Sequence, residues 1–320
     1  MSASRFVRGL TVLLATAAVL AVVSIAGGGT SAGAAPRCFG AAARDARHPC
    51  FNPTRSVTPA PAPADDLAES PCTRTKQKPA PVCTFGVPAA RATGHFALIG
   101  DSHALHWRAA LDVVAQAQRW QGHSITTPAC FYSEAVSALV AGLREPCVPW
   151  YRSAKRWFRA HPDVSTVFVS QSAPTPVVVA PGQTSLAIKV DGFRRAWEGL
   201  PRTVKHVVVI RDTPVIPDGT VACVRHVLAV GRQRPGPACA TPRAVAFADR
   251  EDTAVAAVRA IGSKRFRSVD LTDYFCNRRE CYPVIGGVLV HRDIDHITPL
   301  YARTLGPFLL RKVRFLMASW

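Results

Sequence analysis

The feature that most constrains the fold is an alternation of short apolar runs with helical patterns, which begins near residue 94. The apolar runs have the length of buried strands, and the segments between them repeat apolar residues with the period of a helix. Strands separated by helices pair in parallel, with helices covering both faces of the sheet. We therefore expect residues 91–320 to form one domain, a three-layer α/β/α sandwich around a mostly parallel sheet. The expected strands are 96–99, 164–169, 204–210 and 266–271, and the expected helices are 104–120, 193–200 and 244–261.

The N-terminus has the pattern of an export signal. Arg5 and Arg8 precede an apolar run over residues 10–26, and small residues follow up to Ala35. This order is typical of a secretory signal peptide, here residues 1–34 with cleavage after Ala34. The alternative is an uncleaved membrane anchor, because the run approaches the ~18 residues that can span a bilayer.

Residues 36–90 are rich in proline and show no apolar periodicity. Such a composition favours an extended chain over a packed core. We expect a lead-in that is held by local disulfides and is not a separate packed domain.

All ten cysteines follow the expected cleavage site. An even number of cysteines in an exported chain predicts disulfides. A zinc site is the competing interpretation, but the chain contains no C-x-x-C pair. The spacing leaves several connectivities open, and the simplest joins neighbours in sequence. These pairs are Cys38–Cys50, Cys72–Cys83, Cys130–Cys147, Cys223–Cys239 and Cys276–Cys281.

The formal net charge of the whole chain is +18, and removal of the signal peptide takes away only two arginines. A basic surface attracts polyanions, and outside the cell these are anionic lipid head groups or acidic envelope polymers. The alternative is that the charge only aids solubility. We expect no nucleic-acid partner, because no run of Lys and Arg is interleaved with aromatic residues.

Two segments without a clear strand or helix pattern follow the strands expected over residues 164–169 and 204–210. They are residues 174–183 and residues 213–241, the second of which carries Cys223 and Cys239. Open α/β sheets bind ligands at the carboxyl ends of their strands. Both segments are therefore candidate substrate loops, with structural insertions as the alternative.

A serine stands where the first strand passes into a helix. The strand ends at Gly100, and Ser102 lies at the start of the helix. Free N–H groups and the helix dipole favour the negative charge that develops there during acyl transfer. A lone serine of this kind is more often a helix cap. Of the residues that follow, His103 could line a site, whereas His106 and Trp107 are expected to pack.

Near the C-terminus, Asp293 and His296 offer a carboxylate and an imidazole three residues apart. They precede Pro299, which is typical of the first position of a helix. His296 Nε2 could take the proton of Ser102 while Asp293 holds Nδ1–H and fixes the tautomer. Asp295, adjacent to His296 in the chain, is expected not to reach the same imidazole. The alternative is that the Asp–His pair only braces a loop.

These two motifs resemble the SGNH (GDSL-type) hydrolase superfamily. The strand ends Ile-Gly-Asp-Ser-His at residues 99–103, and the late loop reads Arg-Asp-Ile-Asp-His at residues 292–296. The branch fused to, or encoded beside, membrane acyltransferase-3 proteins is more similar. It shares a lead-in with Pro and Cys, and a late cysteine pair followed by a run like Pro-Val-Ile-Gly-Gly-Val-Leu-Val, here residues 283–290.

The resemblance covers about residues 36–315 and implies a flavodoxin-like domain that acts on O-acyl esters of carbohydrates. It implies that Ser102 is the nucleophile, Asp293 the orienting carboxylate and His296 the base. It also implies that no metal or cofactor is needed.

The chain departs from the family in the groups that would stabilise an oxyanion. SGNH enzymes place a Gly after the second strand and an Asn after the third. Here the second strand, which would lie just before residues 126–130, runs into them without a glycine. The third strand, expected over residues 164–169, ends in residues 169–172 without an asparagine. The Ser102 backbone N–H and the Gln171 side-chain amide remain as candidate oxyanion donors. Each missing donor costs ~2.7–4 kcal/mol of transition-state stabilisation, which would suit a slow or transferring enzyme.

We therefore expect a secreted or envelope-associated serine O-acyl esterase or O-acyltransferase that forms an acyl-enzyme on Ser102. Its expected substrate is an acylated cell-envelope carbohydrate. A transferase would need a separately encoded membrane acyltransferase as partner, because this chain has no membrane-spanning donor half. The alternative from another class is a non-catalytic glycan-binding module that keeps the SGNH fold.

Overall fold

The structure, a computed structural model, describes residues 38–61, 71–74, 82–248 and 251–320. The expected signal peptide lies outside these ranges, as does part of the proline-rich lead-in. Contacts group residues 36–320 into one unit. Among the described residues, no helix is both long and apolar enough to cross a bilayer.

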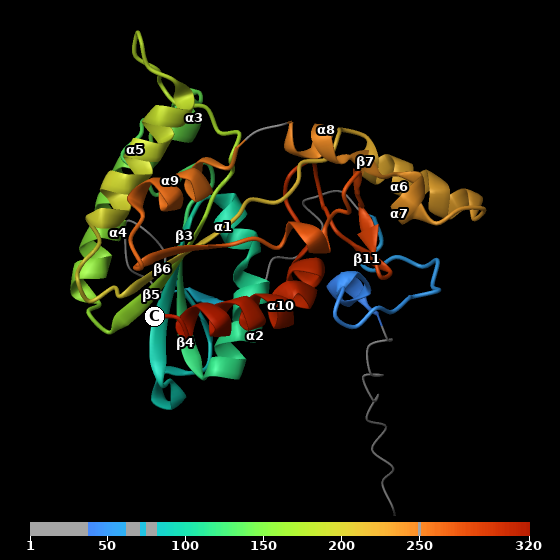
Figure 1. Ribbon diagram of the computed structural model, residues 1–320, viewed down its shortest axis with the longest axis horizontal. Helices are drawn as coiled ribbons and strands as arrows, with labels where there is room; N and C mark the ends of the chain where they lie inside the picture. The colour runs from blue at the N-terminus through green and yellow to red at the C-terminus, as the bar shows by residue number, and fades with distance from the viewer. Residues whose placement is uncertain (1–37, 62–70, 75–81, 249–250) are drawn as a thin grey trace, which may run out of the picture. The chain divides into compact units, whose positions relative to one another are not determined.

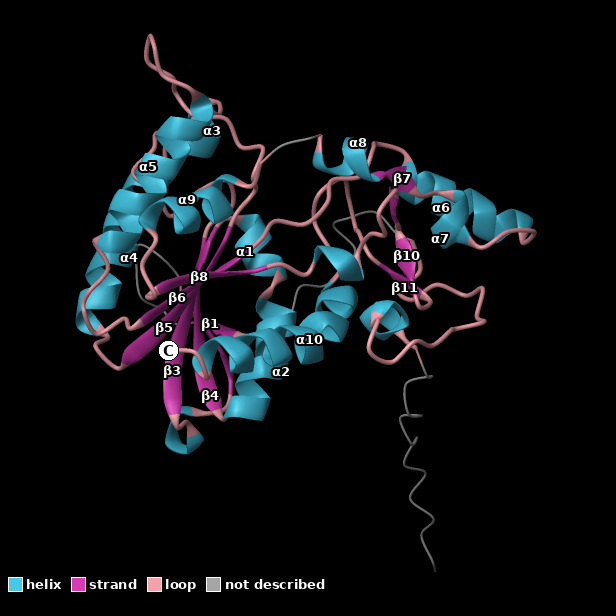
Figure 2. Cartoon of the chain, in the orientation of Figure 1, coloured by secondary structure: helices cyan, strands magenta, loops and turns pink. Residues whose placement is uncertain are grey.

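A seven-stranded sheet lies at the centre of the described structure (Figures 1 and 2). Its order is β1-β2-β4-β3-β5-β6-β8. The strands β4, β3, β5, β6 and β8 are mutually parallel, and β2 and β1 add antiparallel strands at one edge. The parallel part has the flavodoxin-like order 2-1-3-4-5. The expected mostly parallel α/β fold is therefore confirmed. The strands are β1 (Thr73–Arg74), β2 (Cys83–Gly86), β3 (Gly94–Gly100), β4 (Trp120–Thr126), β5 (Val164–Ser170), β6 (His206–Ile210) and β8 (Phe266–Val269).

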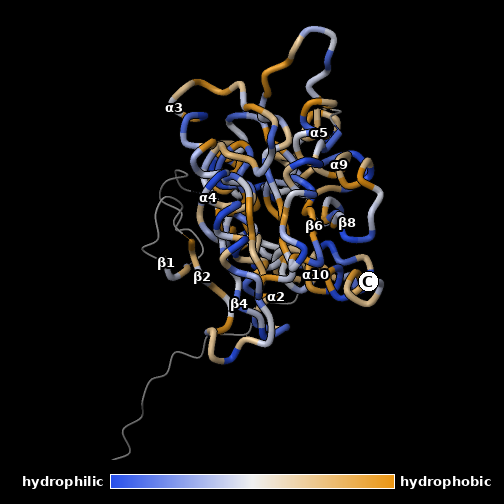
Figure 3. The backbone as a smooth tube through the Cα atoms, turned by 90° about the vertical axis from the view of Figure 1, so that its left-hand side faces the viewer, coloured by the Kyte–Doolittle hydropathy of each residue, from blue (hydrophilic) through white to orange (hydrophobic). Residues whose placement is uncertain are grey.

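The central strands are apolar on both faces because both faces are covered. Alternate residues of β3 enter different cores: Phe96 and Leu98 pack on one side of the sheet, and Ala97 and Ile99 pack on the other. Successive side chains of a strand point to opposite faces, so a strand between two helical layers must be apolar throughout. In Figure 3, orange stretches run through the middle of the molecule, among them β6, mixed with white and pale segments.

The helices form the two outer layers. α4, α5 and α9 cover one face of the sheet, and α2 and α10 cover the other (Figure 1). The expected three-layer arrangement follows. The helices are α1 (Ser102–His106), α2 (Arg108–Gln118), α3 (Ala141–Arg144), α4 (Cys147–Ala160), α5 (Ser185–Glu198), α6 (Thr220–Val230), α7 (Pro235–Ala238), α8 (Arg243–Phe247), α9 (Thr253–Ile261) and α10 (Pro299–Met317).

Two helices that the sequence predicts as continuous are each divided. The helix expected over residues 104–120 breaks at the fully buried Trp107, which separates α1 from α2. Arg119 then turns the chain with φ +56°, and Trp120 already belongs to β4. Likewise, Ala248 ends α8 with φ +45°, and the side chain of Asp252 caps α9 by accepting from two backbone N–H groups. Burial and capping therefore override the helical period at these points.

Besides carrying the local disulfides Cys38–Cys50 and Cys72–Cys83, the lead-in contributes strand β2 to the main sheet. β2 pairs with the open edge of β4, and Phe85 of β2 packs edge to face on Phe96 at 5.4 Å. A 3₁₀ helix, η1 (Gly40–Arg44), packs against α10, where Ala41 N–H donates to Thr304 Oγ1 at 3.0 Å. An exposed sheet edge next to apolar side chains explains why this segment docks.

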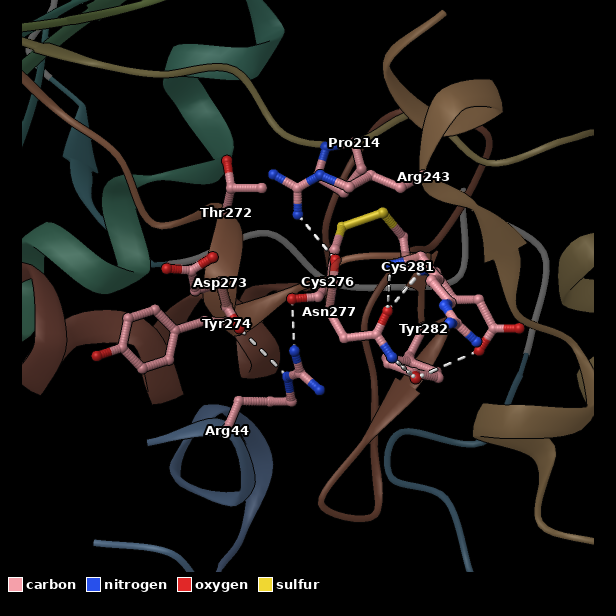
Figure 4. The surroundings of a disulfide bond; sticks show 12 residues. Arg44, Pro214, Arg243, Thr272, Asp273, Tyr274, Cys276, Asn277, Cys281 and Tyr282 are labelled. Atoms are coloured by element: carbon pink, nitrogen blue, oxygen red, sulfur yellow. Dashed lines mark hydrogen bonds between the residues drawn. A yellow bond between two sulfur atoms is a disulfide. The ribbon is translucent and has the colours of Figure 1, made fainter. Parts of the chain in front are cut away.

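All ten cysteines are paired, and the five disulfides join the neighbours in sequence that are named above. Figure 4 shows the surroundings of Cys276–Cys281. Arg44 of the lead-in donates hydrogen bonds to the backbone carbonyls of Asp273 and Cys276, the first at 3.2 Å. The disulfide loop thus ties the lead-in to the C-terminal part of the domain.

The two segments expected as substrate loops differ in structure. Residues 174–183 form neither helix nor strand but join the loop before α3 through the bridge between Ser137 and Val177. Residues 213–241 contain α6 and α7, which are linked by Cys223–Cys239. Short elements complete the described chain: η3 (Ala89–Arg91), β7 (Thr241–Pro242), η4 (Thr272–Tyr274), β9 (Glu280–Cys281), β10 (Val284–Ile285) and β11 (Val288–Leu289).

Candidate active site

Ser102 lies at the carboxyl edge of the sheet, directly after the central strand β3. The register places Gly100 beside Ser170 of β5 and Thr126 of β4, so the segments after all three strands meet at this edge. Gly100 has φ +145°, and a Cβ there would lie 1.9 Å from the Ser170 carbonyl oxygen. Only glycine lets the chain turn so close to the neighbouring strand.

Asp101 fixes the start of α1. Its Oδ1 accepts from the backbone N–H of His103 at 2.8 Å, and its Oδ2 accepts from the backbone N–H of Ser172 at 2.9 Å. The carboxyl is buried at 1% exposure, and this burial raises its pKa. One side chain therefore caps the helix and joins it to the loop after β5, which holds Ser102 in place.

His296 reaches Ser102 from the loop before α10. His296 Nε2 lies 2.8 Å from Ser102 Oγ, although the two residues are 194 positions apart. The loop closes on itself, because Arg292 N–H donates to the His296 carbonyl and His291 forms a bridge with Ile297. An imidazole at this distance can accept the hydroxyl proton.

Two carboxylates face the other nitrogen of His296. Asp293 Oδ2 lies 2.9 Å from Nδ1 and is hydrogen-bonded to it. The expectation that Asp295 does not reach this imidazole is wrong, because Asp295 Oδ1 lies 3.0 Å from the same nitrogen. The cause is the tight turn in which Asp293 Oδ1 accepts from the backbone N–H groups of both Asp295 and His296. That turn folds the Asp295 side chain back toward the ring.

Asp295 also connects His296 to a second imidazole. Asp295 Oδ2 lies 3.5 Å from His103 Nε2, and His103 Nδ1 lies 2.6 Å from Asp212 Oδ1. Asp212 follows β6, and its Oδ2 accepts from the backbone N–H of Ala173 at 2.7 Å. Both His103 and Asp212 are buried. Asp212 belongs to neither of the two sequence motifs, and its signal in the sequence is a carboxylate two residues after an apolar strand, at the edge where ligands bind.

These contacts set the ionisation of the site. Burial alone would lower the pKa of His296, but Asp293 and Asp295 raise it to about 9. Burial likewise opposes the charge on His103, yet the Asp212 and Asp295 carboxylates hold its pKa well above the usual value. Burial would raise the pKa of Asp293 and Asp295, but their hydrogen bonds to the imidazoles lower it below the usual carboxyl range. The cluster is thus a row of alternating charges.

The residues at the other side of Ser102 bear on oxyanion binding. As the first residue of α1, Ser102 has a backbone N–H with no intrahelical acceptor. Gln171 is 3% exposed, and its Oε1 has no hydrogen-bond partner among the described residues. The loop after β4 lacks a glycine, but Ala129 adopts φ +63°, a conformation that favours glycine. Thr127 N–H donates to the Gly100 carbonyl at 3.2 Å, which keeps this loop beside the end of β3.

His103, Asp295 and His296 also bring possible metal-ligating atoms within 4.8 Å of one another. These atoms already face protein partners, since Asp295 lies between the two imidazoles and His296 Nε2 faces Ser102. The donor set therefore has the character of a proton-sharing network. A cavity of about 360 Å³ lies next to Asp293 and is closed on its other side by α6, in the segment expected as a substrate loop.

A flavodoxin-like sheet, a serine after its first parallel strand and an Asp-x-x-His loop before the last helix are the features of an SGNH-type domain. The chain belongs to the family of SGNH domains fused to AT3 domains, whose family model matches residues 71–311. A similar solved structure is the periplasmic domain of the lipopolysaccharide acetyltransferase of Salmonella ser. Paratyphi A. Its TM-score is 0.53 with 12% sequence identity, over 72% of this chain and 90% of that one. At that identity the likeness concerns the fold. No curated protein sequence matches the chain.

Proposed function

We propose that the protein is an exported serine O-acyl esterase or O-acyltransferase that acts on acylated cell-envelope carbohydrate. The observation that carries this proposal is the unbroken series of contacts from Asp293 through His296 to Ser102 Oγ, with distances of 2.9 Å and 2.8 Å. Membership of the SGNH family supports acyl chemistry. A non-catalytic glycan-binding module would not need this alignment.

In the proposed first step, Ser102 Oγ attacks the carbonyl carbon of an ester while His296 Nε2 takes the hydroxyl proton. Asp293 accepts a hydrogen bond from His296 Nδ1–H and stabilises the imidazolium. The Ser102 backbone N–H and the Gln171 amide receive the oxyanion. The ester oxygen then leaves as an alcohol with the proton from His296, and the acyl group stays on Ser102.

In the second step, the hydroxyl of an acceptor attacks the acyl group on Ser102 and takes it from the serine. Water as acceptor gives hydrolysis, and a sugar hydroxyl gives transfer; His296 removes the acceptor's proton and returns it to Ser102. Transfer to a glycan would draw its acyl groups from a membrane acyltransferase encoded separately, as the association of this family with AT3 domains suggests.

We propose an extracytoplasmic location. Five disulfides support it, because such bonds persist in oxidising compartments. The basic composition, +18 for the chain, fits an acidic envelope. In this organisation residues 1–34 are the signal peptide, residues 36–90 the disulfide-bearing lead-in and residues 91–320 the catalytic domain.

A fluorophosphonate probe tests the proposal, because it reacts with serines that a neighbouring base activates. Peptide mass spectrometry should find the adduct on Ser102 in the wild type, and none in Ser102→Ala. His296→Ala should label far more slowly, and the matched control Ser319→Ala, at an exposed serine, should label like the wild type. An unlabelled Ser102 in folded wild-type protein would contradict the proposal.

A further inference from the structure

A groove outside the catalytic contacts runs along the outer side of α4. It has a volume of about 920 Å³, within the range of ligand pockets. One wall is α4, and the other is the segment from Phe131 to Ser137 in the loop after β4. The disulfide Cys130–Cys147 ties the two walls together at one end.

The groove is lined by a row of unpaired arginines. Arg152, Arg156 and Arg159 are spaced i, i+4 and i+7, so they lie on one face of α4, and all three are exposed. Arg144 continues the row at α3. None of these four side chains forms an ion pair or hydrogen bond with another described residue. With Lys155 they place five cations in the groove lining against two carboxylates, Glu134 and Glu145, and this excess of positive charge favours an anionic ligand.

Arginines on the neighbouring helix α5 are ion-paired, unlike those that line the groove. On α5, Arg194 is paired with Asp191 and Glu198, and Arg195 is paired with Asp191 and Glu134. Glu134 is one of the two acidic residues in the groove, and it is already engaged by Arg195, by Lys155 at 3.8 Å and by the Tyr151 hydroxyl at 3.1 Å. Glu145, the other, forms no ion pair with any described residue, so neither carboxylate neutralises the four arginines.

The shape of the charged row favours a chain over a single anionic group. From Arg152 to Arg159 the helix rises by about 10 Å, and Arg144 extends the row further. Between these cations the groove presents apolar and aromatic side chains, among them Phe131, Val148 and Tyr151. A cationic rim over an apolar floor suits an acidic polysaccharide, whose carboxylates or phosphates meet the arginines while its ring faces pack on the floor.

The groove is connected to the catalytic edge of the sheet. Ala129 lines it, and Thr127, two residues earlier, donates its N–H to the carbonyl of Gly100, which precedes the nucleophile by two residues. We propose that the groove is the binding subsite for an acidic glycan chain, which it leads toward Ser102. The direction toward Ser102 rests on the proposed function, whereas the binding of an acidic glycan does not.

The test compares two triple variants of the mature protein that remove equal charge. R152Q/R156Q/R159Q removes three positive charges from the groove. R202Q/R232Q/R278Q neutralises three exposed arginines elsewhere that also make no ion pair among the described residues. Binding of polygalacturonate should weaken by about tenfold or more in the groove variant and by less than about twofold in the control. R152K/R156K/R159K should retain most of the binding, because the charge remains. Equal melting temperatures will show that all variants fold.

Further ligands separate the possible sources of negative charge. Methyl-esterified polygalacturonate should bind far more weakly than the free acid. Equal losses in both triple variants would overturn the proposal, as would binding to phosphatidylglycerol vesicles without binding to polygalacturonate. Ser102→Ala should bind the glycan like the wild type. If Ser102→Ala binds the glycan but the probe does not label Ser102 in the wild type, the groove proposal stands and the catalytic proposal is rejected.

Discussion

At the scale of single residues, His296 is held between two carboxylates and has a pKa of about 9. An imidazole must be neutral to accept a proton, so the active fraction increases as the pH rises through this pKa. Asp295 contributes to the shift in a way that the chain order hides. It is also the link to His103, whose hydrogen bond lowers the pKa of the Asp295 carboxyl.

Asp295→Asn should therefore move the acid limb of the kcat/KM profile to lower pH, because it removes one of the two charges that stabilise the imidazolium. Asp293→Asn should move the limb in the same direction and reduce kcat more, because it also removes the hydrogen bond that orients the ring. The measurement is the pH dependence of ester turnover. Asp163→Asn, at the opposite end of β5, is the control and should leave the profile unchanged. An unmoved limb in Asp295→Asn would show that Asp295 has no influence on the base.

At the scale of elements, strand register decides which groups surround Ser102. Gly100 of β3 is aligned with Ser170 of β5, so Gln171 emerges one residue beyond the neighbouring strand. Its amide oxygen lacks a partner among the described residues, which leaves the amide free to turn toward a ligand. This placement supports Gln171 as the substitute for the missing asparagine.

Gln171→Ala should lower kcat by roughly a hundred- to a thousandfold, because loss of one oxyanion donor costs ~2.7–4 kcal/mol. KM should change little, since the donor acts chiefly in the transition state. Steady-state kinetics on an acyl ester would measure both constants. A fall of less than about threefold would mean that backbone N–H groups alone hold the oxyanion.

The sequence predicts elements where the apolar period dominates and fails where single contacts decide. β3, β5 and β6 follow from their apolar runs, and Thr298 caps α10 where Pro299 predicts the helix start. The break at Trp107 depends on burial against distant residues, which no local pattern contains. The same holds for the contacts of His103 with Asp212 and Asp295, which join segments that are distant in the sequence.

At the scale of the whole molecule, the fold joins both ends of the domain at one edge. Ser102 comes from the first parallel strand, and His296 comes from the loop before the last helix. The distribution of arginines adds a second property, since Arg194 and Arg195 of α5 are ion-paired whereas the exposed arginines of α4 have no ion pair among the described residues. The two together relate the proposed catalytic edge to the proposed glycan-binding groove.

The central claim is that Ser102, His296 and Asp293 act as one unit. The most direct measurement is acyl-ester turnover by Ser102→Ala, His296→Ala and the double variant, with equal folding verified by circular dichroism. Each single change should remove nearly all activity, and the double variant should lose little more, because members of a catalytic triad are strongly non-additive. Independent losses that multiply in the double variant would contradict the account.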